Sequence, residues 1–277
     1  MAKKIVGIIS VEKRKGIRHS EIYDNPYNNF KNDLNIISEL NKVLPKQIEK
    51  YAKAKKRERN KAIKNLNQIE KSEFYKTLEM LSSIKEKKVK AKITKSKVLD
   101  IIHELFYSPI FENRFKIFIR QMSLVYLITE FESFLEWNIA STFRHKPEIL
   151  KSKGKHISYE EMLNHKKVSD LIEYLIEKEI KQVLNLDIEE INSYLKKTFK
   201  GIDLAKIKDW NDFKECFYRR HLIVHNNGMI DKKYCIKTGY SGKLTSLTVD
   251  EDYLNNCLKL FEKYSEKIYK FFKKKFG

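Results

Sequence analysis

A scarcity of helix-breaking residues most constrains how this 277-residue chain can fold. It contains only four prolines and eight glycines, and these two residue types are the ones that most strongly disfavour a helix interior. Apolar residues recur at helical spacing along most of the sequence. The run from Ile5 to Ile9 is a segment that could form a short strand. The sequence therefore predicts an all-α protein with long helices.

The helical pattern divides the chain into two regions. Residues 85–97 are rich in lysine and interrupt the pattern, and Pro109 closes the short helix that follows them. We therefore expect a basic, mostly helical N-terminal region at residues 1–108 and a helical bundle at residues 109–277. Within the first region, Pro45 is expected to start a helix, because proline suits a first turn. Hydrophobic residues make up 42% of the chain, which suffices for at least one sizeable core.

The second region is expected to pack around one central helix. The segment from Phe111 to Phe143 is the most apolar of the predicted helices and has apolar residues on several faces. Capping residues predict where the other helices of this region begin, because their side chains can satisfy free backbone N–H groups. The predicted caps are Ser158, Asp187, Asp209 or Asn211, and Asp250.

Positive charge is concentrated in the first region. The whole chain carries a formal net charge of +20, and the segment from Lys42 to Lys97 alone holds 19 basic and 6 acidic residues. A field of this size attracts polyanions such as RNA, DNA or an anionic lipid surface. A solvated helical face is the plainer interpretation, since an AT-rich genome also enriches lysine and the segment has few aromatic residues for base stacking. Composition alone leaves both interpretations open.

The sequence lacks the signs of a membrane protein and of a disulfide framework. No stretch reaches eighteen apolar residues without a charge, and the first apolar run is too short for the core of a signal peptide. The three cysteines are an odd number and lack the C-x-x-C spacing of a thiolate zinc site. We therefore expect a cytoplasmic protein without a membrane segment, whose cysteines are small buried side chains.

One short run concentrates the groups that could carry chemistry. Residues 219–228, called the motif below, read Arg-Arg-His-Leu-Ile-Val-His-Asn-Asn-Gly and hold two arginines and two histidines near the predicted end of a helix. The closing Asn-Asn-Gly predicts a left-handed helix stop. The chain has no Gly-rich phosphate loop, nucleophile elbow or H-E-x-x-H sequence. Any catalytic chemistry is therefore expected at the motif.

The motif resembles the hallmark of the HEPN superfamily, whose helical-bundle domains carry an arginine, a polar residue, three variable residues and a histidine near a helix end. Arg220, His221 and His225 occupy these places, and the Asn-Asn-Gly stop also resembles that of many members. The upstream helix with Glu130 and Glu132 looks like the long first helix of such domains, which often carries a buried glutamate.

This resemblance, which covers roughly residues 109–272, implies a metal-independent endoribonuclease. It implies a homodimer in which two copies of the motif line one cleft, and cleavage of RNA to 2',3'-cyclic phosphate and 5'-hydroxyl ends. No cofactor and no metal are expected. The setting that the resemblance implies is prokaryotic phage defence, a toxin–antitoxin system or abortive infection, so an antitoxin or a defence-system protein is an expected partner.

The chemistry of RNA cleavage suggests a role for each polar residue of the motif. Such cleavage needs a base for the 2'-hydroxyl proton, an acid for the leaving 5'-oxygen and a cation on the phosphorane. Imidazole, with a pKa of about 6.5, suits the first two tasks, and guanidinium suits the third. We therefore assign His225 to acid–base catalysis and Arg220 to phosphate and transition-state binding. His221 and Asn226 are assigned supporting roles.

Further expectations concern the surroundings of Arg220. Glu132, with Glu130 as the alternative, is expected to orient it. Arg219 is expected at the surface or in contact with RNA. At about 100° per residue, Arg220 and His225 lie about 140° apart around their helix. Two groups so far apart around one helix do not reach the same phosphate easily. A site that combines Arg220 of one chain with His225 of a second chain avoids this problem.

Other interpretations of the same residues remain open at this point. The helix dipole favours positive charge at a helix C-terminus, so an arginine and a histidine there need no catalytic role. His221 and His225 lie four residues apart, as two zinc ligands would, but no third ligand is close by in the sequence. The rival functions are a non-catalytic helical module that binds nucleotide or RNA, and a partner-binding protein whose motif only shapes a dimer.

Overall fold

The computed structural model describes residues 21–83, 96–151 and 156–277. In these residues the chain forms ten α-helices and one short 3₁₀ helix, with no strand, which agrees with the predicted all-α class. Among these helices there is none whose length and apolar content would let it cross a lipid bilayer. The segment from Ile5 to Ile9 lies outside the described residues, as does most of the lysine-rich segment.

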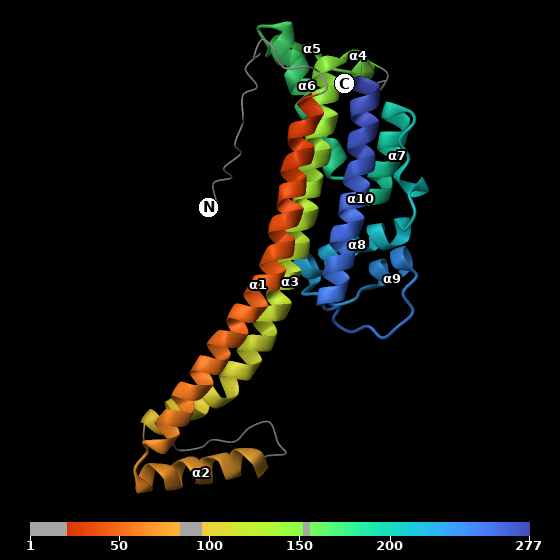
Figure 1. The fold of residues 1–277 in the computed structure, drawn as a ribbon. Helices are drawn as coiled ribbons and strands as arrows, with labels where there is room; N and C mark the ends of the chain where they lie inside the picture. Colours follow the sequence, from red (N-terminus) through yellow and green to blue (C-terminus); the bar gives the residue numbers. More distant parts are fainter. Residues whose placement is uncertain (1–20, 84–95, 152–155) are drawn as a thin grey trace.

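Two long antiparallel helices, α1 (Glu21–Lys64) and α3 (Ser96–His145), run side by side along the molecule (Figure 1). Within their contact, the Asn41 side chain donates a hydrogen bond to Ser123 Oγ over 2.8 Å. At one end other helices surround the pair and form a bundle. At the other end the pair projects beyond the bundle and meets α2 (Gln68–Ser83).

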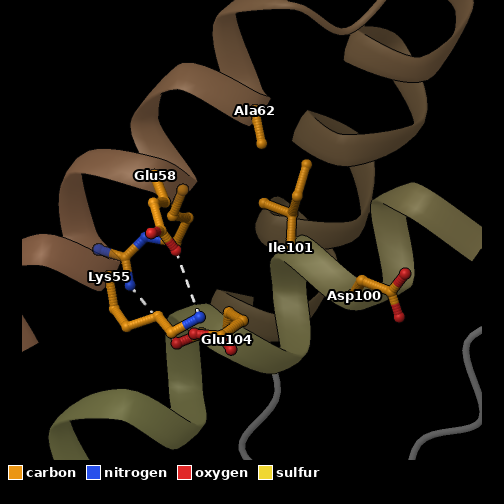
Figure 2. Close-up of a pocket in the computed structure, with 7 residues that line it drawn as sticks. Lys55, Glu58, Ala62, Asp100, Ile101 and Glu104 are labelled. Atoms are coloured by element: carbon orange, nitrogen blue, oxygen red, sulfur yellow. Dashed lines mark hydrogen bonds and ion pairs between the residues drawn. The ribbon is translucent and has the colours of Figure 1, made fainter.

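The projecting part, residues 46–83 and 96–116, is called the arm below. The α1 and α3 segments of the arm face each other across a small pocket of about 190 Å³, into which charged side chains of both helices point (Figure 2). The arm also has a small apolar core, separate from that of the bundle, to which α2 and the start of α3 contribute. Its buried members are Leu66, Phe74, Val98, Ile101 and Ile102.

Shorter helices complete the bundle around α3. The last of them, α10, packs along both α1 and α3, whereas α6 and α8 pack against α3. The helices after α3 are α4 (Glu148–Lys151), α5 (Tyr159–Leu163), α6 (Val168–Leu184), α7 (Ile188–Phe199), the 3₁₀ helix η1 (Leu204–Lys206), α8 (Trp210–Asn226), α9 (Lys232–Thr238) and α10 (Glu251–Phe276).

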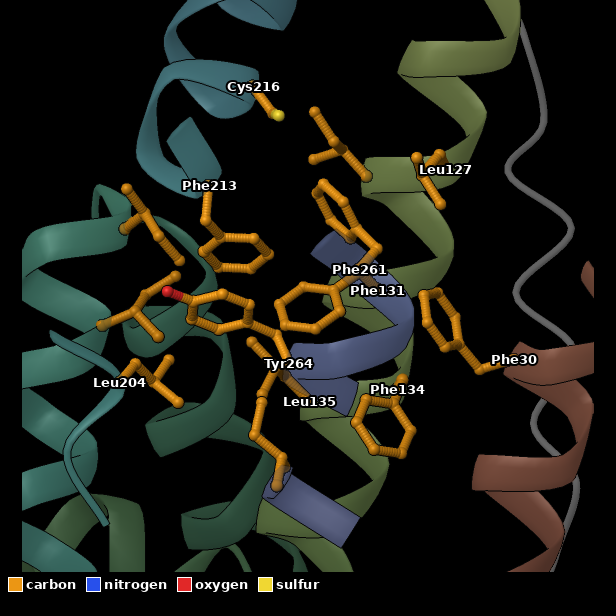
Figure 3. Packing of buried hydrophobic residues seen from close by; sticks show 14 of the residues in the cluster. Phe30, Leu127, Phe131, Phe134, Leu135, Leu204, Phe213, Cys216, Phe261 and Tyr264 are labelled. Carbon is orange, nitrogen blue, oxygen red and sulfur yellow. The ribbon is translucent and has the colours of Figure 1, made fainter. Parts of the chain in front are cut away.

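Aromatic side chains from four helices form the centre of the bundle (Figure 3). Phe131 of α3 meets Phe213 of α8 and Phe261 of α10 edge to face, with ring centroids 5.4 and 5.1 Å apart. Phe213 in turn stacks on Tyr264 at 3.7 Å, and Phe30 of α1 lies 5.8 Å from Phe131. Burying each such ring stabilises the fold by about 1.5–3 kcal/mol. This cluster therefore fixes α8 firmly against α3.

Two predicted helix breaks are wrong. Pro45 lies inside α1 and Pro109 inside α3, and both helices continue through these prolines. A proline inside a helix costs about 3 kcal/mol, but the two helices pack along each other and this contact stabilises the unbroken forms. The predicted division between residues 108 and 109 therefore falls within one continuous helix. Phe30, which belongs to the expected N-terminal region, is also part of the bundle core.

The predicted caps of the later helices are largely confirmed. Ser158 and Asp187 form full capping boxes, and the Asp250 side chain caps α10. Asp209 stands at the N-cap of α8 with a left-handed backbone (φ 71°), and its side chain makes no capping bond to that helix. Between α8 and α10, residues 229–249 contain the short helix α9 and one isolated antiparallel β-bridge that joins Met229 and Ser246.

Candidate functional site

The motif occupies the C-terminal end of α8. The buried face of this helix, which includes Phe213 and Leu222, packs into the bundle core and so determines where the polar side chains lie. The helix ends at Asn226, and Asn227 and Gly228 follow with left-handed backbones, φ 51° and 76°. The N–H groups of Asn227 and Gly228 both donate to the Leu222 carbonyl. The predicted left-handed stop is therefore confirmed.

The segment after α8 holds the end of the motif in place. The Asn226 side chain donates from Nδ2 to the Met229 carbonyl over 2.7 Å, so it supports the turn that follows the helix. The Leu247 N–H donates to the Gly228 carbonyl over 2.9 Å. A Cβ at Gly228 would lie 3.1 Å from both the Leu247 carbonyl oxygen and Ser246 Oγ. Glycine is thus required here by the backbone angle and by the close approach of this segment.

Arg220 reaches from α8 to α3, where it meets Glu132. Its Nη2 donates to Glu132 Oε2 over 3.2 Å, and the two side chains are 29% and 28% exposed. Burial raises the pKa of Glu132, and the charge of Arg220 opposes that shift. Arg220 Nε is also buried and has no hydrogen-bond partner among the described residues. The structure thus brings together the predicted arginine and the glutamate that was expected to orient it.

Glu130, the alternative partner of Arg220, lies in different surroundings. Positions two apart on a helix point about 160° away from each other, and Glu130 is near Asp33 and Tyr126. Burial and the neighbouring Asp33 carboxylate raise the pKa of Glu130. Of the two glutamates that the sequence offered, Glu132 is the one that contacts Arg220.

The two histidines of the motif form a pair at the protein surface. Their rings lie 4.7 Å apart between centroids, as expected for positions one turn apart, and both residues are exposed. Partial desolvation lowers the pKa of His221, and the nearby His225 and Lys233 lower it further. A histidine with a lowered pKa is neutral at neutral pH and can accept a proton. His221 is therefore suited to act beside His225 as an acceptor.

Arg220 and the histidine pair face different directions within one chain. No hydrogen bond joins Arg220 to His225 in the described part of the chain, and the helix separates them by about 140°. Arg220 contacts α3, whereas His221 and His225 lie on the exposed side of α8. The single chain therefore supplies the expected groups without bringing Arg220 and His225 together.

Arg219 is more enclosed than the sequence led us to expect. Only 15% of its side chain is exposed. It donates from Nε to Glu215 over 2.7 Å and from Nη1 to the Thr248 carbonyl over 3.1 Å, and its guanidinium lies 3.7 Å from the Tyr253 ring centre. These contacts tie α8 to α10 and to the segment before it. Arg219 is therefore half-buried instead of fully exposed, and its contact with RNA stays a prediction.

Glu215 is a residue of this region that sequence reasoning missed. It accepts hydrogen bonds from Arg219 and from the hydroxyl groups of Tyr234 and Tyr253. It thereby links α8, α9 and α10 directly beneath the motif. The spacing of Glu215 and Arg219, four residues apart on a helix, is the signal that could have revealed half of this network.

The histidine pair is not part of a larger group of metal-binding side chains within the described residues. Among them, no cluster of three or more histidine, cysteine, aspartate or glutamate side chains could hold a metal ion. Cys216 and Cys257 are both buried free thiols, with their sulfur atoms 3.2 Å apart, while Cys235 is half-buried. The expectation of buried cysteines is thus confirmed for two of the three.

No protein-family model matches this chain, and neither a curated protein nor a solved structure matches it. The function is therefore inferred from the chemistry and arrangement of its own residues.

Proposed function

We propose that this protein is a metal-independent endoribonuclease of the HEPN type. The observation that carries the proposal is the arginine held by a partly buried glutamate, Arg220 with Glu132, on the same helix end as an exposed histidine pair. A cation fixed by a carboxylate suits the stabilisation of a phosphorane, and two adjacent imidazoles suit proton transfer. This combination matches the needs of RNA cleavage by the neighbouring 2'-hydroxyl.

In this mechanism the RNA supplies its own nucleophile. A neutral imidazole takes the proton of the 2'-hydroxyl, whose oxygen attacks the adjacent phosphorus. Arg220 binds the non-bridging phosphate oxygens as negative charge builds up on them. A protonated imidazole gives its proton to the 5'-oxygen as the P–O5' bond breaks. The products are a 2',3'-cyclic phosphate and a 5'-hydroxyl. We assign the acid–base role in these proton transfers to His225.

A homodimer completes the site in this proposal. Arg220 and His225 point in different directions on one helix, so a second copy of the motif can place its histidine against the arginine of the first. Two apolar residues close to the histidines in the chain, Val224 and Met229, are 48% and 44% exposed, and Ile236 on the neighbouring helix α9 is 82% exposed. Exposed apolar side chains gathered around a polar site are typical of an interface.

The biological setting follows from the same resemblance. We propose a cytoplasmic nuclease that acts in phage defence or as a toxin, with an antitoxin or a defence-system protein as a partner. A cytoplasmic ribonuclease without a restraint would damage the RNA of its own cell. Control by such a partner therefore belongs to the proposal.

The test compares the wild-type protein with Arg220→Ala and His225→Ala on cellular RNA in the presence of EDTA. Each substitution is expected to lower cleavage by about 100-fold or more, because it removes transition-state charge stabilisation or proton transfer. The fragments should carry 2',3'-cyclic phosphate and 5'-hydroxyl ends. His156→Ala, at another exposed histidine, is the matched control and should cleave as the wild type does.

The same comparison separates the enzyme from its rival, a non-catalytic RNA-binding module. A binding module needs the positive charge of Arg220 but tolerates His225→Ala. RNA that stays intact with folded wild-type protein, together with binding that only Arg220→Ala weakens, would favour the module over the enzyme.

A further inference from the structure

Six basic residues lie along one face of α1 in the arm. They are three or four residues apart, so they fall within an arc of about 80° around the helix and extend over about 27 Å along it. We call them the basic stripe. Its members are Lys46, Lys50, Lys53, Arg57, Lys61 and Lys64.

No residue of the basic stripe forms an ion pair within the described part of the chain, although the Glu49 carboxylate attracts Lys46 and Lys53 at longer range. All six side chains are exposed, and none of them forms an ion pair or hydrogen bond with a described residue. The two acidic residues of the same span are engaged elsewhere. Glu49 binds Lys116 of α3 at 2.9 Å, and Glu58 binds Lys55 at 3.2 Å. The stripe is therefore a continuous line of unpaired positive charge.

Basic residues on the opposite face of the same helix have structural roles. Lys55 and Arg59 lie about half a turn away from the stripe and line the pocket between α1 and α3 (Figure 2). Arg59 donates from Nη1 to the Glu104 carbonyl over 3.4 Å. The stripe makes no comparable contact with the part of α3 whose side chains the structure describes. Like charges in a row repel one another and do not stabilise the arm, so folding of the arm does not account for them.

We propose that the basic stripe binds the phosphodiester backbone of RNA. Ammonium and guanidinium groups bind phosphate oxygens whatever the base, so this contact is independent of sequence and sensitive to salt. In naming RNA, the inference rests on the proposed nuclease function and extends it. The stripe gives the enzyme a second RNA-binding site, which is not catalytic and which only long RNA can reach.

An anionic membrane is the other polyanion that such a surface could attract. Helices that lie on lipid place large apolar side chains beside their basic residues, so that these enter the acyl region. Between its charges the stripe instead carries the small Ala54 and the polar Asn60, both exposed. The face lacks the apolar anchors of a lipid-binding helix, and RNA is therefore favoured.

The position of the stripe relative to the motif can be followed through α3, which contacts both α1 and α8. The stripe begins about one turn after Asn41, which binds Ser123 of α3. Two residues before Ser123, the Gln121 side chain lies beside Gly228, 3.9 Å from where a Cβ would be. The stripe thus starts within about two helical turns of the level of the motif, but α3 lies between them, because Ser123 and Gln121 point about 160° apart on that helix.

The test measures RNA binding by a stripe variant, K50Q/K53Q/R57Q/K61Q, and by a control variant with the same change in net charge. Glutamine has nearly the same helix propensity as lysine and arginine, so the arm should stay folded, which circular dichroism checks. Both variants also carry His225→Ala, so that the RNA stays intact. The control replaces four exposed lysines of the bundle region with glutamine. These are Lys166, Lys181, Lys259 and Lys267.

Affinity for a labelled single-stranded RNA longer than the stripe is measured over a range of salt concentrations. The stripe variant is expected to bind at least about tenfold more weakly than the parent, and its slope of log affinity against log salt should be about 3 units shallower. The control variant should stay within about twofold of the parent. Equal losses in the two variants would overturn the proposal, because they would reflect net charge alone.

Two further measurements separate this proposal from its competitor and from the nuclease function itself. Binding to phosphatidylserine vesicles that the stripe variant loses, with unchanged RNA binding, would overturn the proposal in favour of a membrane. With His225 intact, the stripe variant should cleave a trinucleotide as the wild type does and long RNA more slowly. If the wild type cleaves no RNA but RNA binding still depends on the stripe, the proposed nuclease function is wrong. The proposal that the stripe binds RNA is then still supported.

Discussion

The carboxylate of Glu132 lies partly buried against Arg220, 3.2 Å from its guanidinium. Burial raises the pKa of Glu132 even though the charge of Arg220 opposes the shift. The ionised form of this carboxylate is therefore less stable in the folded protein than in water. As the pH rises through the ordinary range of glutamate, ionisation of this group therefore favours the unfolded chain. Since ionised Glu132 does not stabilise the fold, we infer that the role of the Glu132–Arg220 pair is to hold the Arg220 side chain in position.

Glu132→Gln tests that interpretation. The glutamine oxygen can still accept from Arg220, so the free energy of unfolding should change by less than about 1 kcal/mol. Loss of the charge that orients Arg220 should nevertheless lower RNA cleavage by about 10- to 100-fold. Cleavage rates and denaturant unfolding measure the two effects. Glu130→Gln, next to Asp33 instead, is the control, and an equal loss of cleavage in that variant would count against a special role for Glu132.

The lowered pKa of His221 gives a prediction for a neighbouring lysine. Desolvation lowers this pKa, and His225 and Lys233 add to the shift, so protonation of His221 favours the unfolded chain as the pH falls through the ordinary histidine range. Lys233→Gln removes one positive charge and should raise the pKa of His221. Titration of the imidazole signals by NMR measures the shift. Lys232→Gln is the control, and an unchanged or lower pKa of His221 in Lys233→Gln would refute the assignment.

The candidate residues of the motif could be selected from the sequence because the relevant pattern is local. Arg220, His221 and His225 lie within six positions of one another, and the upstream helix offered only two candidate glutamates. The sequence did not decide between Glu132 and Glu130 as the partner of Arg220, because that choice depends on which face of α3 meets α8. The enclosure of Arg219 could not be seen, because Tyr253 and Thr248 come from distant parts of the chain.

At the level of single elements, the end of α8 depends on a glycine that is both left-handed and crowded. Gly228 has φ +76°, and an added Cβ would lie 3.1 Å from two neighbouring oxygen atoms. Gly239, at the end of α9, has nearly the same angle, φ +73°, but no atom within 4 Å of such a Cβ. The two glycines therefore separate the effect of backbone angle from that of crowding.

Gly239→Ala should lower the free energy of unfolding by about 1 kcal/mol through backbone strain alone. Gly228→Ala should lower it by about 2 kcal/mol or more, because the Leu247 carbonyl must also move. Denaturant unfolding measures both values. Equal losses in the two variants would show that the segment before α10 does not press against the end of the motif.

The helix starts of the bundle were predictable, whereas the continuity of the long helices was not. A capping box such as Ser158 with Glu161 needs only four consecutive residues, so the sequence contains the whole signal. The passage of α1 through Pro45 and of α3 through Pro109 depends on packing between helices that are far apart in the sequence. Local propensity gave the wrong result there because tertiary contacts outweigh it.

Across the whole molecule, α1 and α3 join the arm to the bundle, so the two parts share a scaffold. The first half of α1 contributes Phe30 to the core around Phe131, while its second half carries the basic stripe. Composition indicated a basic N-terminal region, but not that its first helix belongs to the bundle. A charge count gives no information on which side chains are buried.

The exposed apolar side chains around the motif give a prediction for assembly. Ile236 is 82% exposed on α9, and burying it in a dimer would favour association. If the proposed dimer uses this surface, Ile236→Glu should shift it toward monomer and lower RNA cleavage in parallel. Ile69→Glu, at a 73% exposed position on α2 of the arm, is the matched control. Analytical ultracentrifugation measures the assembly, and an unchanged dimer in Ile236→Glu would exclude this surface from the interface.

The most direct test of the central claim, a site built from the Arg220 of one chain and the His225 of another, uses mixed dimers. Chains carrying Arg220→Ala and His225→Ala are given different affinity tags, combined, and purified as mixed dimers. Each parent variant alone is inactive in the proposed mechanism. A mixed dimer keeps one of two composite sites intact and should show about half the cleavage rate of the wild type. A mixed dimer as inactive as its parents would contradict the account.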